Sequence, residues 1–263
     1  MLSTVLTRAA TPLLAAGLLV VGCAKPAPSP PHSGPAHTQN PPTTAGPQSP
    51  RFPQGKALRE PALPAEIPRL GPRTRDRVPD GTNQAVVVTG EDRDSSRSTA
   101  VLYERDPVKG WKAVSGPWPA HNALNGWTDE HWAGDRRSPI GVFGLTDAGG
   151  RLPDPGTKIP YHQEEDLFAA GGTGFLGESL EGSFDYVVAI NYNRRPGASP
   201  LYDDDSRPMG WDRGGGVWFH VDHEGPTQAC VSLTRGRMRQ LLLWLDPDER
   251  PVVVMGDAAA LAR

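Results

Sequence analysis

The sequence predicts a mostly β domain with one helix and long loops, preceded by an N-terminal extension. Runs of β-branched residues recur through the second part of the chain, bounded by Gly, Pro and Asp. A single segment repeats apolar residues at helical spacing. Residues 81–263 are numerous enough to bury a core of their own, so we expect one domain there.

The expected elements follow from these patterns in chain order. Strands are predicted at 84–90, 99–106, 111–116, 140–145, 185–192, 216–221 and 250–256, with a turn "DPVKG" joining the second and third. Long loops are predicted at 117–138, 146–183 and 193–215. The helix is predicted at 234–245. Thr234 would be its N-cap and Pro247 would end it, and the apolar residues at helical spacing are Met238, Leu241, Leu242 and Leu245.

The first 22 residues have the pattern of a secretory signal. Arg8 precedes the apolar run "PLLAAGLLVVG", which is too short to span a membrane comfortably. The run ends in Val20-Val21-Gly22-Cys23, which resembles a bacterial lipobox whose cysteine is lipidated and becomes the mature N-terminus. We therefore expect an extracytoplasmic protein, anchored by a lipid on Cys23 to the outer face of the cell membrane. An ordinary signal peptide with an incidental Cys23 is the alternative.

Residues 23–80 are predicted to form a disordered tether. Residues 24–80 hold 15 of the 29 prolines and a single aromatic, Phe52, so they offer little apolar surface to bury. They carry eight basic and four acidic side chains, which suits either a solvated linker or contact with anionic lipid or wall polymer. Residues 81–263 carry 18 basic and 26 acidic side chains, a balance of −8 that argues against a nucleic-acid partner.

Cys230 is the only cysteine outside the N-terminal extension, and its surroundings are suited to nucleophilic chemistry. A thiol attacks acyl carbons as thiolate, so it needs a nearby base or a positive field. If 216–221 is a strand, His220 faces away from Val217, Phe219 and Val221, beside a turn that can return the chain towards it. "CVSL" then leads into the predicted helix, whose positive end would favour thiolate.

Two other roles of Cys230 stay open on these residues. It could join His220, Asp222 and His223 in a zinc site, although a regular strand points residues 220 and 223 to opposite faces. It could also be an inert, buried cysteine, which is the usual role of a lone thiol.

The segment 216–233 resembles the catalytic signature of the L,D-transpeptidases, the YkuD-type family. That signature has a His in an apolar strand, then Ser/Thr-His-Gly-Cys-Ile/Val-Arg-Leu/Met, a helix and a final strand. "RRSPIGVFGL" is similar to the family's Thr-Pro-x-Gly-x-Phe strand, and "VVAINYNRRP" (187–196) to a segment of exported actinobacterial members. The likeness covers residues 84–256, and the matching positions are Pro139, Gly141, Phe143, His220, Thr227, Cys230, Val231 and Leu233.

The chain departs from the family pattern at three positions. Gln228 replaces the usual His, which leaves His220 as the base. Ala229 replaces Gly, and its Cβ would be strained if the family's glycine has a positive φ. Ser232 replaces Arg, so a cation for the substrate would come from elsewhere. The candidates for that cation, which are also ordinary loop charges, are Arg194, Arg195 and Arg213.

The resemblance implies a YkuD-type β-sandwich that performs acyl transfer on peptidoglycan stem peptides, with no metal or organic cofactor. Cys230 would be the nucleophile and His220 the base, and the backbone N–H groups of Ala229 and Cys230 would form the oxyanion hole. Orienting or substrate contacts would come from Thr227, Gln228, His223, Arg194 and Arg195. An L,D-carboxypeptidase with water as acceptor, or a catalytically inactive wall-binding lipoprotein, is the alternative.

Overall fold

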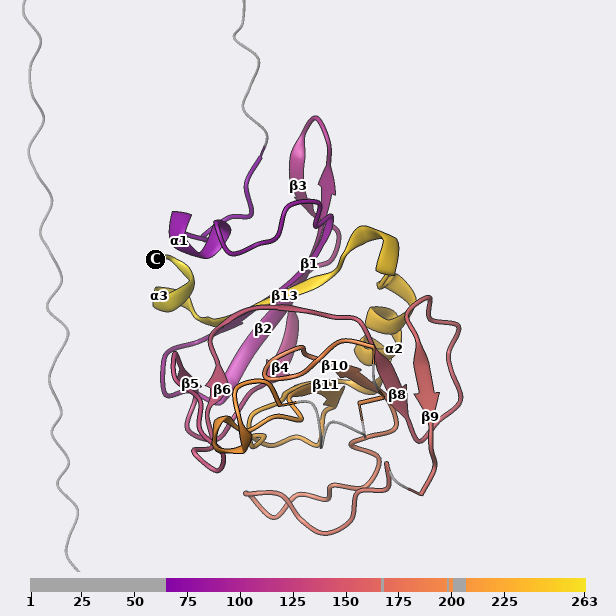
Figure 1. Ribbon diagram of the computed structural model, residues 1–263. Helices are drawn as coiled ribbons and strands as arrows, with labels where there is room; N and C mark the ends of the chain where they lie inside the picture. Colours follow the sequence, from indigo (N-terminus) through magenta and orange to yellow (C-terminus); the bar gives the residue numbers. More distant parts are fainter. Residues whose placement is uncertain (1–64, 167, 198, 201–206) are drawn as a thin grey trace, which may run out of the picture. The chain divides into compact units, whose positions relative to one another are not determined.

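The computed structural model describes residues 65–263 apart from 167, 198 and 201–206, and it is mostly β, as predicted (Figure 1). The elements in chain order are α1 (Pro72–Arg75), β1 (Gln84–Gly90), β2 (Arg97–Asp106), β3 (Gly110–Ala113), β4 (Trp118–His121), β5 (Trp127–Thr128), β6 (Ser138–Pro139), β7 (Gly141–Gly144), β8 (Ala148–Gly150), β9 (Tyr161–Gln163), β10 (Val187–Ala189), η1 (Trp211–Arg213), β11 (Trp218–Val221), β12 (Val231–Leu233), α2 (Arg235–Trp244), η2 (Pro247–Glu249), β13 (Val252–Asp257) and α3 (Ala258–Leu261).

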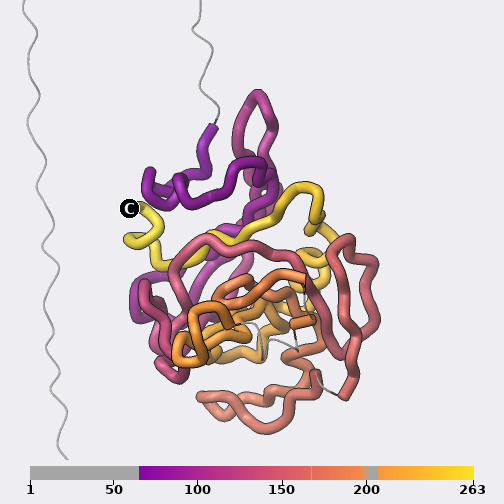
Figure 2. Tube along the Cα trace, viewed as in Figure 1, coloured from indigo at the N-terminus to yellow at the C-terminus, as the bar shows by residue number. Residues whose placement is uncertain are grey.

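Eleven of the strands form one sheet, which the chain trace shows to be curled (Figure 2). Its order is β7-β13-β1-β2-β4-β12-β11-β10-β8-β9, with β3 paired to β2, while β5 and β6 form a separate two-stranded sheet. The last strand, β13, lies parallel to β1, and the β11–β12 pair is also parallel. Most of the other pairs in the sheet are antiparallel.

The centre of the sheet is buried on both faces, which explains the near-continuous valine runs of β1 and β13. Val86 and Val88 of β1 point into the main core, together with Val253 of β13. Alternate residues of the same strands, such as Val87, pack in a second cluster on the opposite face. The apolar side of α2 covers the main core with three fully buried side chains, Met238, Leu241 and Leu242, and Leu245 at the C-cap is fully buried beside them.

Most predicted elements are confirmed, and the missed ones are short. The helix is confirmed as α2, with Thr234 at its N-cap, although its side chain makes no capping hydrogen bond. The strands β4, β5, β8 and β9 lie within segments predicted as loops, and each has only two to four residues. Alternation over so few residues cannot be distinguished from loop sequence.

The folded part begins earlier than the boundary predicted at residue 81. The predicted signal peptide (1–22), the lipidated Cys23 and tether residues up to 64 lie outside the described residues. Residues 65–80, expected to belong to the tether, are folded: Ile67 and Leu70 are 3% and 5% exposed in the second core cluster. The prolines around Ile67 and Leu70 made the segment resemble a disordered tether in the sequence. No helix in the described part of the chain is long and apolar enough to cross a membrane.

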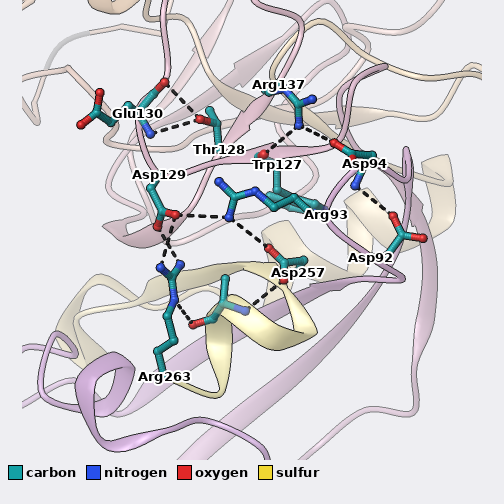
Figure 3. A network of polar contacts seen from close by, with 11 residues as sticks. Asp92, Arg93, Asp94, Trp127, Thr128, Asp129, Glu130, Arg137, Asp257 and Arg263 are labelled. Atoms are coloured by element: carbon teal, nitrogen blue, oxygen red, sulfur yellow. Dashed lines mark hydrogen bonds and ion pairs between the residues drawn. The ribbon is translucent and has the colours of Figure 1, made fainter.

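A polar network fixes the C-terminus against the segment after β5 (Figure 3). Asp129 accepts hydrogen bonds from Arg263 at 2.7 Å and from Arg93 at 3.2 Å. The hydrogen bond from Arg263, with that from Arg93, holds the pKa of Asp129 below its ordinary value. At the other end of the same segment, Arg137 donates to Asp94 at 2.8 Å and to the carbonyl of Trp127 at 3.1 Å. The loop between these two anchors is therefore held at both ends.

The folded position of Leu70 predicts a measurable effect on stability. Leu70→Ala should lower the free energy of unfolding by about 2–5 kcal/mol, because it removes a buried side chain and leaves a cavity. Val108→Ala, at a site 79% exposed, is the control and should change little. Chemical denaturation of the full chain measures both. Equal effects of the two substitutions would show that residues 65–80 do not belong to the folded unit.

Candidate active site

The parallel pairing of β11 and β12 places His220 and Cys230 on the same face of the sheet. Phe219 is opposite Val231 and His220 is opposite Ser232, so Cys230 lies one position before the first pair. Phe219 and Val231 are fully buried in the main core. Because side chains alternate along a strand, Trp218 and His220 face away from that core, as predicted, and Cys230 points the same way.

The connection between the two strands, residues 222–230, is fixed to the segment after β4. The N–H of Thr227 donates to the carbonyl of Asn122 at 3.0 Å, and the N–H of Leu124 donates to the carbonyl of Thr227 at 2.9 Å. The hydroxyl of Thr227 donates to the carbonyl of Cys230 at 2.7 Å. Thr227 therefore holds the backbone of Cys230 in place.

A cavity of about 460 Å³ opens over this face. One wall comes from β11 and the connection after it, and the other comes from residues 170–184, of which 170–183 lie in the loop predicted at 146–183. Phe184 packs its ring edge-on against both Trp218 and His220, with centroids 5.3 and 5.5 Å away. The side chains and backbone that line the cavity include Thr173, Phe175, Ser183, Phe184, Gly216, Trp218, His220, His223, Thr227, Gln228, Ala229 and Cys230.

The thiol of Cys230 is protonated at neutral pH. Burial raises its pKa to about 11, against the smaller opposing effect of the Trp218 N–H, which donates to the sulfur at 3.4 Å. The thiol in turn donates to the carbonyl of Gly216 at 3.6 Å. The positive helix end predicted beside Cys230 is absent, because β12 separates it from α2 by about 10 Å of extended chain.

His220 is a buried neutral imidazole with a defined tautomer. Its Nδ1 lies 2.9 Å from the carbonyl of Val221, and a carbonyl only accepts, so Nδ1 carries the proton. Burial, with a smaller contribution from the neighbouring His223, lowers the pKa of His220 to about 4. The lone pair is therefore on Nε2, the nitrogen that can take a proton. Within the described residues, no hydrogen bond joins His220 to the thiol of Cys230.

The expectation that His223 points away from His220 is corrected. The two rings stack in parallel, with centroids 5.6 Å apart and planes 8° from each other. The alternation fails because the strand ends at Val221, and the chain then turns through Glu224, whose φ is +65°. Nδ1 of His223 lies 3.2 Å from a carboxylate oxygen of Glu178, so this ring links the connection to the opposite wall of the cavity.

A second polar cluster supports the far end of the β11–β12 pair. Asp222 accepts hydrogen bonds from the buried hydroxyl of Ser232 at 2.7 Å and from Nδ1 of His121 on β4 at 2.8 Å. The hydrogen bond to Asp222 raises the pKa of His121. Ser232, which stands where the resembled family has arginine, is thus an anchor for the connection. His121 and Asp222 are far apart in sequence, so local sequence pattern could not predict this cluster.

The predicted conflict at Ala229 does not arise. Glu224 is the non-glycine residue with a positive φ in the connection, and Ala229 is not in that region. In the described part of the chain, the N–H groups of Ala229 and Cys230 donate no hydrogen bond to another protein group. They are therefore available to an incoming oxygen. Gln228 is exposed at the rim of the cavity.

The arginines considered for substrate contact do not line this cavity. Arg194 is buried and forms an ion pair with Asp147, with the donor nitrogen 2.8 Å from the carboxylate oxygen. Arg195 is exposed, and the guanidinium of Arg213 lies over the ring of Trp132. The direction of a long arginine side chain on a loop cannot be predicted from sequence. The expectation that these arginines contact the substrate therefore had no support from local pattern.

No set of three or more His, Cys, Asp and Glu side chains in the described residues is arranged to hold a metal ion. Searches against models of known protein families and against curated proteins find no match to this chain.

The raised thiol pKa predicts how Cys230 reacts with a small alkylating agent. In a Cys23→Ser background, the iodoacetamide rate should rise about tenfold per pH unit between pH 7 and 10, because thiolate forms only near pH 11. The same chain unfolded in urea should level off near pH 9, as an ordinary thiol does. A plateau below pH 8 in the folded protein would contradict a thiol that is neutral at rest.

Proposed function

We propose that this protein is a peptidoglycan L,D-transpeptidase, a cysteine acyltransferase of the YkuD type with the family's β-sandwich. The observation that carries the proposal is the shared face of His220 and Cys230, beneath one cavity, next to the available N–H groups of Ala229 and Cys230. These are the nucleophile, base and oxyanion donors that acyl transfer through a thioester needs. The sequence resemblance supplies the substrate, the peptidoglycan stem peptide.

The first half-reaction forms the thioester. The sulfur of Cys230 attacks the carbonyl carbon of the third stem residue, and the thiol proton passes to Nε2 of His220. The bond to the terminal D-alanine breaks, and the departing amine takes that proton. Since both side chains are neutral in the resting site, proton transfer has to accompany attack rather than precede it. The N–H groups of Ala229 and Cys230 would stabilise the oxygen as its charge develops.

The second half-reaction restores the enzyme. The amine of a second stem attacks the thioester carbonyl, a new peptide bond forms, and Cys230 leaves as a thiol after the amine proton returns through His220. Phe184 and Trp218 would exclude water from this step, because they line the cavity beside the sulfur. The N-terminal signal and Cys23 would hold the domain outside the cell membrane, facing the wall.

The raised pKa of Cys230 favours a second candidate, a catalytically inactive wall-binding lipoprotein. A thiol with a pKa of about 11 and no hydrogen bond to His220 is a poor nucleophile at rest. The two candidates differ in whether the thiol proton of Cys230 can pass to His220 when an acyl group is bound.

A carbapenem separates the candidates, because its strained ring presents an acyl carbon that needs no stem peptide. We expect the full chain to gain one drug mass at Cys230, located by peptide mapping, and Cys230→Ser to gain none. His220→Gln should slow acylation by roughly 10²–10⁴-fold, because the proton acceptor is lost. His223→Gln should slow it much less, since that ring contacts Glu178 instead of the sulfur.

Two outcomes would contradict the proposal. A folded protein that forms no adduct over hours would contradict the transpeptidase and favour the inactive wall-binding lipoprotein. An adduct whose rate is the same in His220→Gln and in the unchanged chain would remove His220 as the base.

A further inference from the structure

Two tryptophans are exposed beyond what the fold requires. Trp132 is 48% exposed and Trp211 is 56% exposed, whereas the other five tryptophans of the chain are buried or half-buried. Large aromatic side chains contribute most when they are buried, so a pair left in solvent marks a contact surface. Neither residue lines the cavity over Cys230.

The loops that carry these tryptophans lie side by side. The N–H of Ala133 donates to the carbonyl of Asp212 at 2.9 Å, which joins the residue after Trp132 to the residue after Trp211. Each ring also carries an arginine: Arg213 lies over Trp132 at 4.6 Å from the ring centroid, and Arg207 lies over Trp211 at 4.3 Å. We call Trp132, Trp211, Arg207 and Arg213 the tryptophan platform.

The platform is held in place before any ligand arrives. The N–H of Trp132 donates to the carboxylate of Asp135 at 2.9 Å, and the hydroxyl of Tyr192 donates to the carbonyl of Arg213 at 2.9 Å. The loop that carries Trp132 is also anchored at both ends, by Asp129 and Arg137 (Figure 3). A surface fixed in this way loses little conformational entropy when a ligand binds.

We infer that the tryptophan platform binds the glycan strand of the cell-wall polymer. The C–H faces of pyranose rings stack on flat aromatic rings, and guanidinium groups donate hydrogen bonds to sugar hydroxyl and acetamido oxygens. An anionic lipid surface suits the platform less, because residues 81–263 have a balance of −8 and Asp135 and Asp212 lie among the platform residues.

The position of the platform relative to Cys230 fits the same polymer, and this step rests on the proposed function. Only Gly214 and Gly215 separate Arg213 from Gly216, which lines the cavity, so the chain between them spans at most about 10 Å. A stem peptide reaches from its sugar to its third carbonyl over a similar three residues. A second link runs through Arg136, which lies 5.3 Å from the ring centroid of Phe175 in the cavity wall.

The test measures binding of a hexamer of β-1,4-linked N-acetylglucosamine to the full chain by calorimetry. We expect binding by the unchanged protein and a loss of about tenfold or more in Trp132→Ala with Trp211→Ala, in line with aromatic stacking. The corresponding phenylalanine substitutions keep a flat ring and should retain most of the affinity. Trp111→Ala, on β3, is the matched control and should bind like the unchanged chain.

Carbapenem acylation of Cys230 is measured on the same variants, because it needs no glycan. Intact acylation with lost hexamer binding in the alanine variant supports the platform and shows that the site still folds. If the unchanged chain is acylated but does not bind the hexamer, the glycan-binding platform is overturned and the transpeptidase is not. If the unchanged chain binds the hexamer through the tryptophans but is not acylated, the transpeptidase is overturned and the platform is not. Equal binding by the alanine variant, or a dimer that this variant dissociates in sedimentation, also overturns the platform.

Discussion

The parallel pairing of β11 with β12 is the constraint on which the candidate site depends. It sets His220 and Cys230 on one face only because Phe219 and Val231 are held in the core on the other. A one-residue slip of either strand would bury the histidine or the thiol among apolar side chains. Two anchors prevent such a slip: Thr227, at the cavity wall, fixes one end of the connection, and Asp222 with Ser232, outside the cavity, fixes the other.

The same burial that fixes the site also sets its chemistry. Burial of the imidazole and partial burial of the thiol move their pKa values apart, to about 4 and about 11, so neither is charged at rest. A site of this kind does not hold a preformed thiolate and imidazolium pair. Its activity would therefore depend on attack of the sulfur on a substrate carbonyl at the same time as His220 accepts the thiol proton. The tryptophan platform would add selectivity by holding the polymer before that step.

Much of this fold follows from local pattern. The valine runs of β1 and β13 predict two strands because both faces are buried, and the apolar spacing of α2 predicts its length. The site was predictable where one strand governs it, as for His220. It was not predictable where the chain leaves the strand, as at His223, or where partners meet across more than a hundred residues, as do His121 and Asp222.

The remaining misses have the same physical origin. β12 has three residues, too few to show alternation, so Cys230 was expected beside a helix that begins only after that strand. Ile67 and Leu70 stand among prolines in the sequence, although both are buried in the second core cluster.

Incubation of the full chain with a stem tetrapeptide that ends in D-alanine tests the central claim most directly. Intact-mass and peptide mass spectrometry should find the tripeptide acyl group on Cys230, with one D-alanine released for each adduct before a second amine is added. A folded protein that releases no D-alanine and carries no acyl group on Cys230 would contradict the account.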